Sequence, residues 1–243
     1  MTDLLILGGT TEARQFADLV VRMEVTAIVS LAGVTAVPAD MALPTRTGGF
    51  GGPEGLIAWM RENTVKSVVD ATHPFAERMP WNVAQACEEL GIPRLRLVRP
   101  GFRKDPDWRQ AVNLEDAIAP LPTENRVLLT TGRSDLEVLS LRPDLKAFVR
   151  TIEPIGDLPE NAEAFLIQPP LDLTEELAFL RTQRVQTVIA KDSGGPTRTK
   201  LEAAKLVGAE VILIKRPEQP PGPTVETVDQ AVAWLRQVVG IGK

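Results

Sequence analysis

The sequence predicts an α/β protein with two Rossmann-like domains, mostly parallel sheets and a ligand cleft between the domains. The first observation is that short apolar runs alternate with amphipathic stretches along the 243 residues, and strand-helix-strand order of this kind gives parallel strands with right-handed crossovers. The second is a similarity between residues 65–76 (VKSVVDATHPFA) and 185–197 (VQTVIAKDSGGPT), each followed by a helical stretch and a similar closing phrase. Two units with the same wiring explain this similarity better than one large sheet, although ordinary strand-helix-strand order can imitate it.

The first half begins with a buried strand at residues 3–7, which ends in two glycines. Residues 11–23 follow as a helix, because their apolar side chains recur at helical spacing. These side chains are Ala13, Phe16, Ala17, Val20 and Val21. The later elements of this half are strands at 26–32, 66–71 and 94–98 and helices at 53–63 and 84–90.

Residues 99–125 are rich in proline and charge, and we interpret them as the passage between two domains, predicted at 1–108 and 109–243. The second half again alternates. Its predicted strands are 126–133, 146–152, 164–168, 186–190 and 210–217, and its helices are 174–184, 197–208 and 228–240. The segment Pro217–Pro223 is interpreted only as a proline-stiffened connection before the last helix.

Composition restricts the class of protein. A net charge of −5 gives no electrostatic support for nucleic-acid binding. A single histidine and a single cysteine argue against a metal site, and Cys87 is expected to be a small buried hydrophobe. No apolar stretch has the length of a membrane span and the N-terminus lacks a signal-peptide pattern, so we expect a cytoplasmic protein without membrane association. Nothing in the sequence requires an oligomer.

The first motif with chemistry is the run Gly8-Gly9-Thr10-Thr11-Glu12-Ala13, at a strand-to-helix turn. A phosphate is favoured there, because backbone N–H groups and the helix dipole converge and glycine permits close approach. The run is not a full G-x-G-x-x-G, since Thr10 replaces the second glycine. A helix cap made by Thr10 or Thr11 is an equal alternative.

The second strand ends in Ser30, where an NAD-specific site usually carries an acid that binds the ribose hydroxyl. A serine does not repel a 2′-phosphate, and Arg46 offers a positive charge just before the glycine-rich loop. We therefore expect NADPH if a nicotinamide cofactor binds, with Gly49 and Phe50 of the loop among its contacts. The loop is equally compatible with a flexible connection.

The only histidine, His73, follows a predicted strand together with Asp70 and Thr72. All three lie on the rim of the sheet where strand ends gather and ligands bind. His73 has three open roles: contact with the nicotinamide ribose or amide, proton donation, or a structural role. We place His73 and Thr72 among the candidate cofactor contacts.

Six segments occur in a fixed order along nearly the whole chain: LILGGTTEAR, SLAG, GGFGG, DATHPFA, TTGR and KDSGG. With these segments the chain resembles the precorrin-6A reductase family of cobalamin biosynthesis. The resemblance implies that NADPH reduces a macrocyclic double bond of precorrin-6A to give precorrin-6B. It further implies that the first domain holds the cofactor and that the second binds the tetrapyrrole. The chain departs from the family pattern at Val34 and at Leu166–Leu171.

A precorrin carries many carboxylate side chains, so its site should present scattered cations and N–H donors. Two predicted strand-to-helix loops have this character. The expected substrate contacts are Thr131, Gly132, Arg133, Lys191, Ser193, Gly194 and Arg198. The alternative is that the charges at the start of the last of these helices, Arg198 and Lys200, are merely solvated. No catalytic residue is assigned; Lys191 and Asp192 are candidates for the proton donor, and solvent is another.

Several enzyme classes are excluded. The chain has no tyrosine, so it lacks the Tyr-x-x-x-Lys pair of short-chain dehydrogenases, and it has neither a G-x-S-x-G elbow nor a P-loop. Two alternatives to the reductase stay open: another NADP-linked reductase, and a non-catalytic sensor that binds a dinucleotide through Gly9, Thr10 and Thr11.

Overall fold

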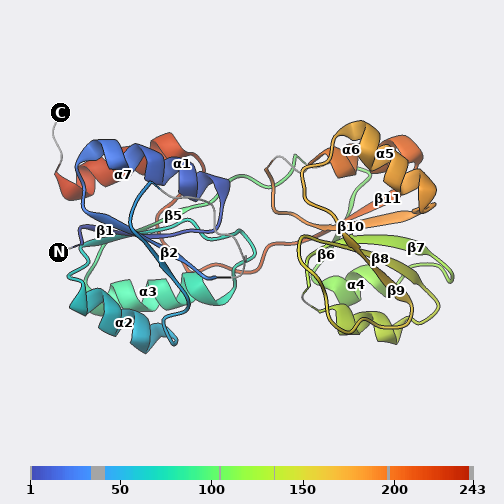
Figure 1. Ribbon diagram of the computed structural model, residues 1–243, viewed down its shortest axis with the longest axis horizontal. Coiled ribbons are helices and arrows are strands. Elements are labelled where there is room, and N and C mark those ends of the chain that lie inside the picture. Colours follow the sequence, from blue (N-terminus) through green and yellow to red (C-terminus); the bar gives the residue numbers. More distant parts are fainter. Residues whose placement is uncertain (1, 34–41, 104, 134, 196–197, 241–243) are drawn as a thin grey trace. The chain divides into compact units, whose positions relative to one another are not determined.

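The computed structural model describes residues 2–33, 42–103, 105–133, 135–195 and 198–240, and it divides into two compact units. Unit 1 comprises Met1–Pro100 and Pro217–Lys243, and unit 2 comprises Gly101–Arg216. Each unit has one six-stranded sheet, and Figure 1 shows helices on both faces of each sheet. Every strand pairing among the described residues is parallel, which confirms the predicted α/β class with mostly parallel sheets.

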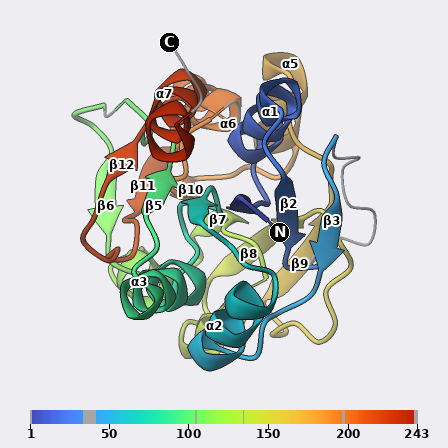
Figure 2. The ribbon, with the colours of Figure 1, turned by 90° about the vertical axis from the view of Figure 1, so that its left-hand side faces the viewer.

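The sheet of unit 1 has the strand order β12-β5-β4-β1-β2-β3. Its strands are β1 (Leu4–Leu7), β2 (Ala27–Leu31), β3 (Thr45–Thr47), β4 (Ser67–Asp70), β5 (Arg94–Leu97) and β12 (Thr224–Val225). Helices α1 (Thr11–Val20) and α7 (Val228–Val239) cover one face, and α2 (Pro53–Glu62) and α3 (Arg78–Leu90) cover the other (Figure 2). A short 3-10 turn, η1 (Val21–Met23), continues α1. Because both faces are covered, β1 and β4 are buried along their whole length.

The sheet of unit 2 has the order β6-β11-β10-β7-β8-β9. Its strands are β6 (Arg109–Ala111), β7 (Arg126–Thr130), β8 (Lys146–Thr151), β9 (Ala162–Leu166), β10 (Thr187–Lys191) and β11 (Glu210–Ile214). Its helical elements are α4 (Leu114–Ile118), η2 (Leu136–Leu141), α5 (Leu173–Thr182) and α6 (Thr199–Val207). Figure 1 shows α5 and α6 on one face and α4 on the other.

The two sheets repeat one pattern. Strands β4 and β10, which contain the two similar sequence segments, both occupy the third position of their sheets, and β5 and β11, which carry the closing phrases, both occupy the second. The internal similarity therefore corresponds to equivalent positions in the two units.

The unit boundaries differ from the predicted division at residue 108. After β5 the chain enters unit 2 and adds β6 beside β11, and after β11 it returns to unit 1 and adds β12 beside β5. Helix α7 follows β12, and its Ala231 and Leu235 are fully buried in the core beside α1. The first crossover is thus followed by β6 and α4 in unit 2, and the second is followed by β12 and α7 in unit 1. Sequence order conceals this exchange, because the two closing phrases look alike and either return is locally possible.

Two further differences concern short elements. Strand β3 lies in a stretch interpreted as a loop, and β6 and α4 lie in the stretch interpreted as a passage between domains. Each has only three to five residues, too few for a periodic pattern to stand out. Among the described helices, none is long and apolar enough to cross a membrane.

Candidate functional site

The candidate site of unit 1 lies at the carboxyl ends of β1, β2 and β4. Strand β1 pairs with β2 on one side and with β4 on the other, so the connections leave β1 in opposite directions. Such a switch point is where open parallel sheets bind ligands. The predicted cofactor contacts lie in the turns after β1 and β4, at the end of β2, on β3 and in the loop after β3.

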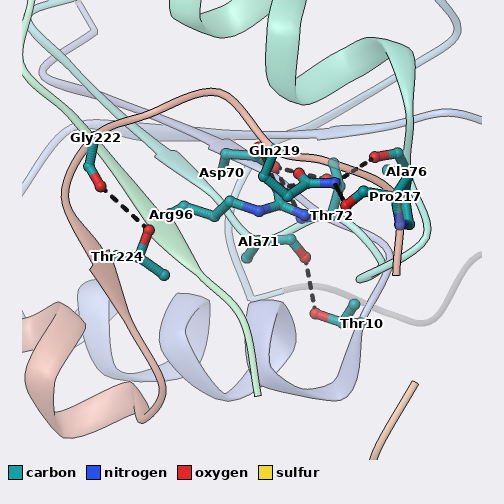
Figure 3. Close-up of polar contacts among 10 residues, drawn as sticks. All are labelled: Thr10, Asp70, Ala71, Thr72, Ala76, Arg96, Pro217, Gln219, Gly222 and Thr224. Carbon is teal, nitrogen blue, oxygen red and sulfur yellow. Dashed lines mark hydrogen bonds and ion pairs between the residues drawn. The ribbon is translucent and has the colours of Figure 1, made fainter. Parts of the chain in front are cut away.

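Thr10 connects the turn after β1 to the loop after β4. Its hydroxyl donates to the carbonyl of Ala71 at 2.8 Å (Figure 3). The same oxygen accepts the N–H of Ala13 at 3.1 Å and caps α1. The capping interpretation is thus correct for Thr10, and its hydroxyl has a structural role.

The turn after β1 nevertheless keeps the features that a phosphate needs. Gly9 has a φ of 122°, which an L side chain rarely adopts, and a Cβ there would meet no described atom within 4 Å. The N–H groups of Thr11 and Glu12, in the first turn of α1, have no partner inside the helix. The carboxylate of Glu12 pairs with Arg99 at 2.9 Å, which offsets its charge at this helix end.

Arg46 brings together the second group of predicted contacts. It lies on β3 directly opposite Ser30 of β2. Its Nη1 donates to the Ser30 hydroxyl at 2.8 Å and its Nη2 donates to the carbonyl of Gly49 at 3.1 Å. Its guanidinium lies 3.9 Å from the ring centre of Phe50, and partial burial lowers its pKa. Four residues chosen from the sequence therefore form one positively charged cluster.

A buried ion pair lies below the loop that follows β4. Asp70 and Arg96 are neighbours on β4 and β5, and Nη1 of Arg96 donates to the Asp70 carboxylate at 2.5 Å (Figure 3). The hydroxyl and the N–H of Thr72 both donate to the other carboxylate oxygen. Thr72 is therefore engaged with Asp70. Nε and Nη2 of Arg96 are buried without a partner among the described residues.

His73 lies at the surface of the same loop. Its Nδ1 accepts the N–H of Phe75 at 3.2 Å, and its ring centre lies 6.1 Å from that of Phe75. Because Nδ1 accepts, the neutral imidazole carries its proton on Nε2.

The segment Pro217–Pro223 is the return crossover into unit 1. The side-chain amide of Gln219 donates to the carbonyls of Ala76 and Pro217 (Figure 3). The carbonyl of Pro223 accepts the N–H of Arg96 at 3.0 Å. The segment is therefore hydrogen-bonded to the loop after β4 through Gln219. Its proline content alone does not indicate this role.

In unit 2 the predicted substrate contacts follow β7 and β10, which are adjacent in the sheet. Thr131 is buried, and its hydroxyl has no partner within the described residues. Gly132 has a φ of 89°. Arg133 pairs with Glu153 at 3.1 Å, and its side chain is 47% exposed. This loop thus presents a cation to solvent.

The loop after β10 is more tightly connected. The carboxylate of Asp192 accepts the N–H of Phe102 at 2.7 Å, which fastens the start of unit 2. The N–H of Ser193 donates to the carbonyl of Lys191, and Gly194, with a φ of 66°, is buried.

Arg198 is held by three partners. It pairs with Glu202, donates to the carbonyl of Arg103 and lies 5.3 Å from the ring of Trp108. These contacts hold the side chain of Arg198 in place.

The predicted site omits four charged residues, Arg96, Arg150, Glu176 and Lys200, and the polar Gln219 of the return crossover. A signal was present for the arginines, because RLRLV and FVRT each contain a cation within a buried strand, where apolar residues are the rule. Val34 lies outside the described residues. Leu166–Leu171 begins at the end of β9, and Leu166 is 63% exposed.

Two parallel sheets, each with a switch point at its centre, define a Rossmann-like α/β protein. The family model "Precorrin-6x reductase CbiJ/CobK" matches residues 3–236, and the chain belongs to this family.

Relatives with known names agree in length with this chain. A precorrin-6A reductase of Mycobacterium tuberculosis is 40% identical, over 97% of this chain and 98% of its own. A cobalt-precorrin-6A reductase of Priestia megaterium is 29% identical, over 96% and 97%. The solved structure "CobK precorrin-6A reductase" has a TM-score of 0.89 and 36% identity, and the match covers 98% of this chain and 97% of that one.

Proposed function

We propose that this protein is an NADPH-dependent precorrin-6A reductase, which reduces one double bond of the macrocycle to give precorrin-6B in cobalamin biosynthesis. The observation that carries the proposal is the family match over residues 3–236. The higher identity to relatives named for the metal-free substrate, 40% against 29%, favours precorrin-6A over its cobalt form.

The residues of unit 1 fit a dinucleotide phosphate. Space is open above Gly9, the first turn of α1 offers N–H donors, and Arg99 offsets the charge of Glu12. At the end of β2 a serine stands where an acid would repel a 2′-phosphate, and Arg46 adds positive charge beside it. These features support NADPH over NADH.

NADPH, when bound, supplies the hydride, and the protein has to position the reactants and exclude water. The loop after β4 is suited to positioning, because hydrogen bonds fix it at two places. Thr72 is bonded to Asp70, which pairs with Arg96, and Gln219 donates to the carbonyl of Ala76. His73 lies exposed on this loop, and its Nδ1 accepts the N–H of Phe75. Asp192 is bonded to backbone, so solvent is the better proposal for the proton.

Unit 2 is the proposed binding unit for the anionic tetrapyrrole. Arg133 carries an exposed cation beside the buried Thr131 hydroxyl, at the carboxyl end of the sheet. The absence of a membrane-spanning helix among the described residues and the acidic charge balance are compatible with the proposed cytoplasmic enzyme.

The test is a turnover assay with purified protein, NADPH and precorrin-6A, in which NADPH absorbance at about 340 nm falls and precorrin-6B is identified by mass. Parallel reactions contain NADH or cobalt-precorrin-6A. We expect oxidation to be fastest with NADPH and precorrin-6A. NADPH binding without turnover of either macrocycle would favour the sensor, and turnover of an unrelated substrate alone would favour a different reductase.

A further inference from the structure

The chain passes between the two units twice. It leaves unit 1 after Pro100 and enters unit 2 at Gly101, and it leaves unit 2 after Arg216 and enters unit 1 again at Pro217. We call residues 99–102 the first crossing segment and residues 216–219 the second. Because these segments carry the chain from one unit to the other, the way in which each unit anchors them is a property of the connection itself.

In unit 2 both crossing segments are bonded to the same residue, Asp192, which directly follows β10. Its Oδ1 accepts the N–H of Phe102 at 2.7 Å, and its main-chain carbonyl accepts Nε of Arg216 at 2.8 Å. Its own N–H donates to the carbonyl of Ile214, the last residue of β11, at 2.9 Å. Phe102 is itself buried in the core of unit 2. Asp192 therefore fastens the incoming and the outgoing segment to the carboxyl end of this sheet.

The first crossing segment passes very close to the Asp192 carboxylate. A Cβ at Gly101 would lie 2.8 Å from both of its oxygens, a distance shorter than a van der Waals contact. Glycine, which has no Cβ, permits this approach. A larger residue at position 101 would therefore displace either the carboxylate or the segment.

In unit 1 each crossing segment is bonded to a loop of the proposed cofactor site. Arg99 of the first segment pairs with Glu12, in the first turn of α1, at 2.9 Å. Gln219 of the second segment donates to the carbonyl of Ala76, in the loop after β4 (Figure 3). Each segment thus connects a proposed cofactor loop in unit 1 with Asp192 in unit 2.

We propose that Asp192 is a positioning residue for hydride transfer, which acts through the two crossing segments and not as a proton donor. This inference rests on the proposed function, in which unit 1 holds the cofactor and unit 2 the macrocycle. Transfer requires the reacting atoms to approach to about 3–3.5 Å, and a misplacement of about 1 Å is enough to slow a reaction strongly. Loss of the Asp192 anchor therefore slows the transfer step without removing a contact to either ligand.

Two substitutions separate positioning from proton transfer. Asp192→Ala removes the acceptor for the N–H of Phe102, whereas Asp192→Asn keeps an acceptor oxygen there but has no acidic proton. We expect D192A to lower kcat by about 10- to 100-fold, with KM for NADPH and for precorrin-6A within about threefold. With NADPH deuterated at the transferred position, the isotope effect on kcat should rise in D192A, because transfer becomes the slowest step.

The conservative variant decides between the two roles. D192N should keep kcat within about threefold of the wild type, because its amide oxygen can accept the same N–H. A kcat for D192N as low as that of D192A would assign Asp192 to proton transfer and overturn the proposal. An unchanged kcat in D192A would overturn it as well.

Gly101→Ala perturbs the same contact from the other side. Its Cβ would displace the carboxylate, so G101A should lower kcat as D192A does, and the double variant should lose no more than D192A alone. The matched control is Gly156→Ala, because a Cβ at Gly156 meets no described atom within 4 Å and kcat should not change. Additive losses in the double variant would show that the two residues act independently and would refute the shared anchor.

Amide hydrogen exchange tests the anchor without catalysis. We expect D192A and G101A to speed exchange at Phe102 at least about tenfold in the protein without ligands, and D192N to stay within about threefold. Strand β7 in the core of unit 2 should exchange at the wild-type rate. Unchanged exchange at Phe102 in D192A, or equal acceleration in β7, would refute a local anchor. If the wild-type protein turns over no precorrin-6A, the proposed function fails, and the exchange result still decides whether Asp192 anchors the crossing segments.

Discussion

We expect the substitution Lys200→Met to stabilise the folded protein, whereas most substitutions destabilise it. The pKa of Lys200 is lowered from 10.5 to about 8 in the folded protein, chiefly by burial. The folded protein therefore binds the Lys200 proton more weakly than the unfolded chain does, and the difference between the two pKa values corresponds to about 3 kcal/mol. Because Lys200 is only half-buried, we take about 1–2 kcal/mol as the expected gain from K200M at about pH 7.

The sign of the pH dependence follows from the same pKa. Between about pH 8 and pH 10.5 the unfolded chain holds more protons at Lys200 than the folded protein, so wild-type stability rises with pH across this window relative to K200M. The penalty is fully present below about pH 8 and is lost above pH 10.5. The advantage of K200M should therefore shrink by about half between about pH 7 and about pH 9.5.

Urea denaturation followed by Trp108 fluorescence measures this effect in unit 2. Trp108 packs against the core of that unit, and it becomes the only tryptophan of the chain when the other three are replaced by phenylalanine. These are Trp59, Trp81 and Trp234. The control Lys205→Met loses an ion pair and should gain no stability at either pH. An advantage of K200M that is equal at the two pH values, or a loss of stability at about pH 7, would refute the reasoning.

Three further predictions concern unit 1. Arg46→Ala should raise KM for NADPH by about 10-fold and change KM for NADH little, because it removes charge near a 2′-phosphate; an equal rise for both cofactors in the turnover assay would contradict this. Arg96→Met should cost about 3 kcal/mol in urea denaturation because it leaves Asp70 buried and unpaired, and the double variant with Asp70→Asn should recover part of the loss; additive losses would argue against a coupled pair. A fragment of residues 1–108 should lack cooperative unfolding by circular dichroism, whereas co-expression with residues 217–243 should restore it; a cooperative transition for the fragment alone would show that β12 and α7 are dispensable.

The elements that the sequence predicted well are those with a strong periodic pattern. Strand β1 is apolar throughout and is buried on both faces, and α1 buries the four residues Ala13, Phe16, Ala17 and Val20, all of them in the predicted stripe. The short elements β3, β6 and α4 have no such pattern. The exchange of β12 and α7 was not predictable from local pattern either, because sheet membership depends on contacts between distant parts of the chain.

The candidate site was predictable in part for a related reason. Glycines and cations after predicted strands identify the correct edge of each sheet, since parallel strands end together. The hydrogen bonds and ion pairs among these residues are less predictable from the sequence. Arg198 pairs with Glu202, whereas Lys200 makes no ion pair or hydrogen bond in the described chain. Helical spacing does place Glu202 four residues after Arg198, and this i,i+4 relation was an available signal.

The two buried arginines suggest how a charged residue in a buried strand should be interpreted. Arg96 and Arg150 come from different positions of their sheets, yet each pairs with a carboxylate through Nη1 and leaves Nε and Nη2 without a partner among the described residues. A purely structural pair would be expected to satisfy its donors, because a partly satisfied buried network is less stable than an apolar core. Both arginines lie near the carboxyl ends of their strands, where the sheets are expected to bind ligands. Local rules are most often broken at functional sites, and the spare donors of both arginines agree with that interpretation.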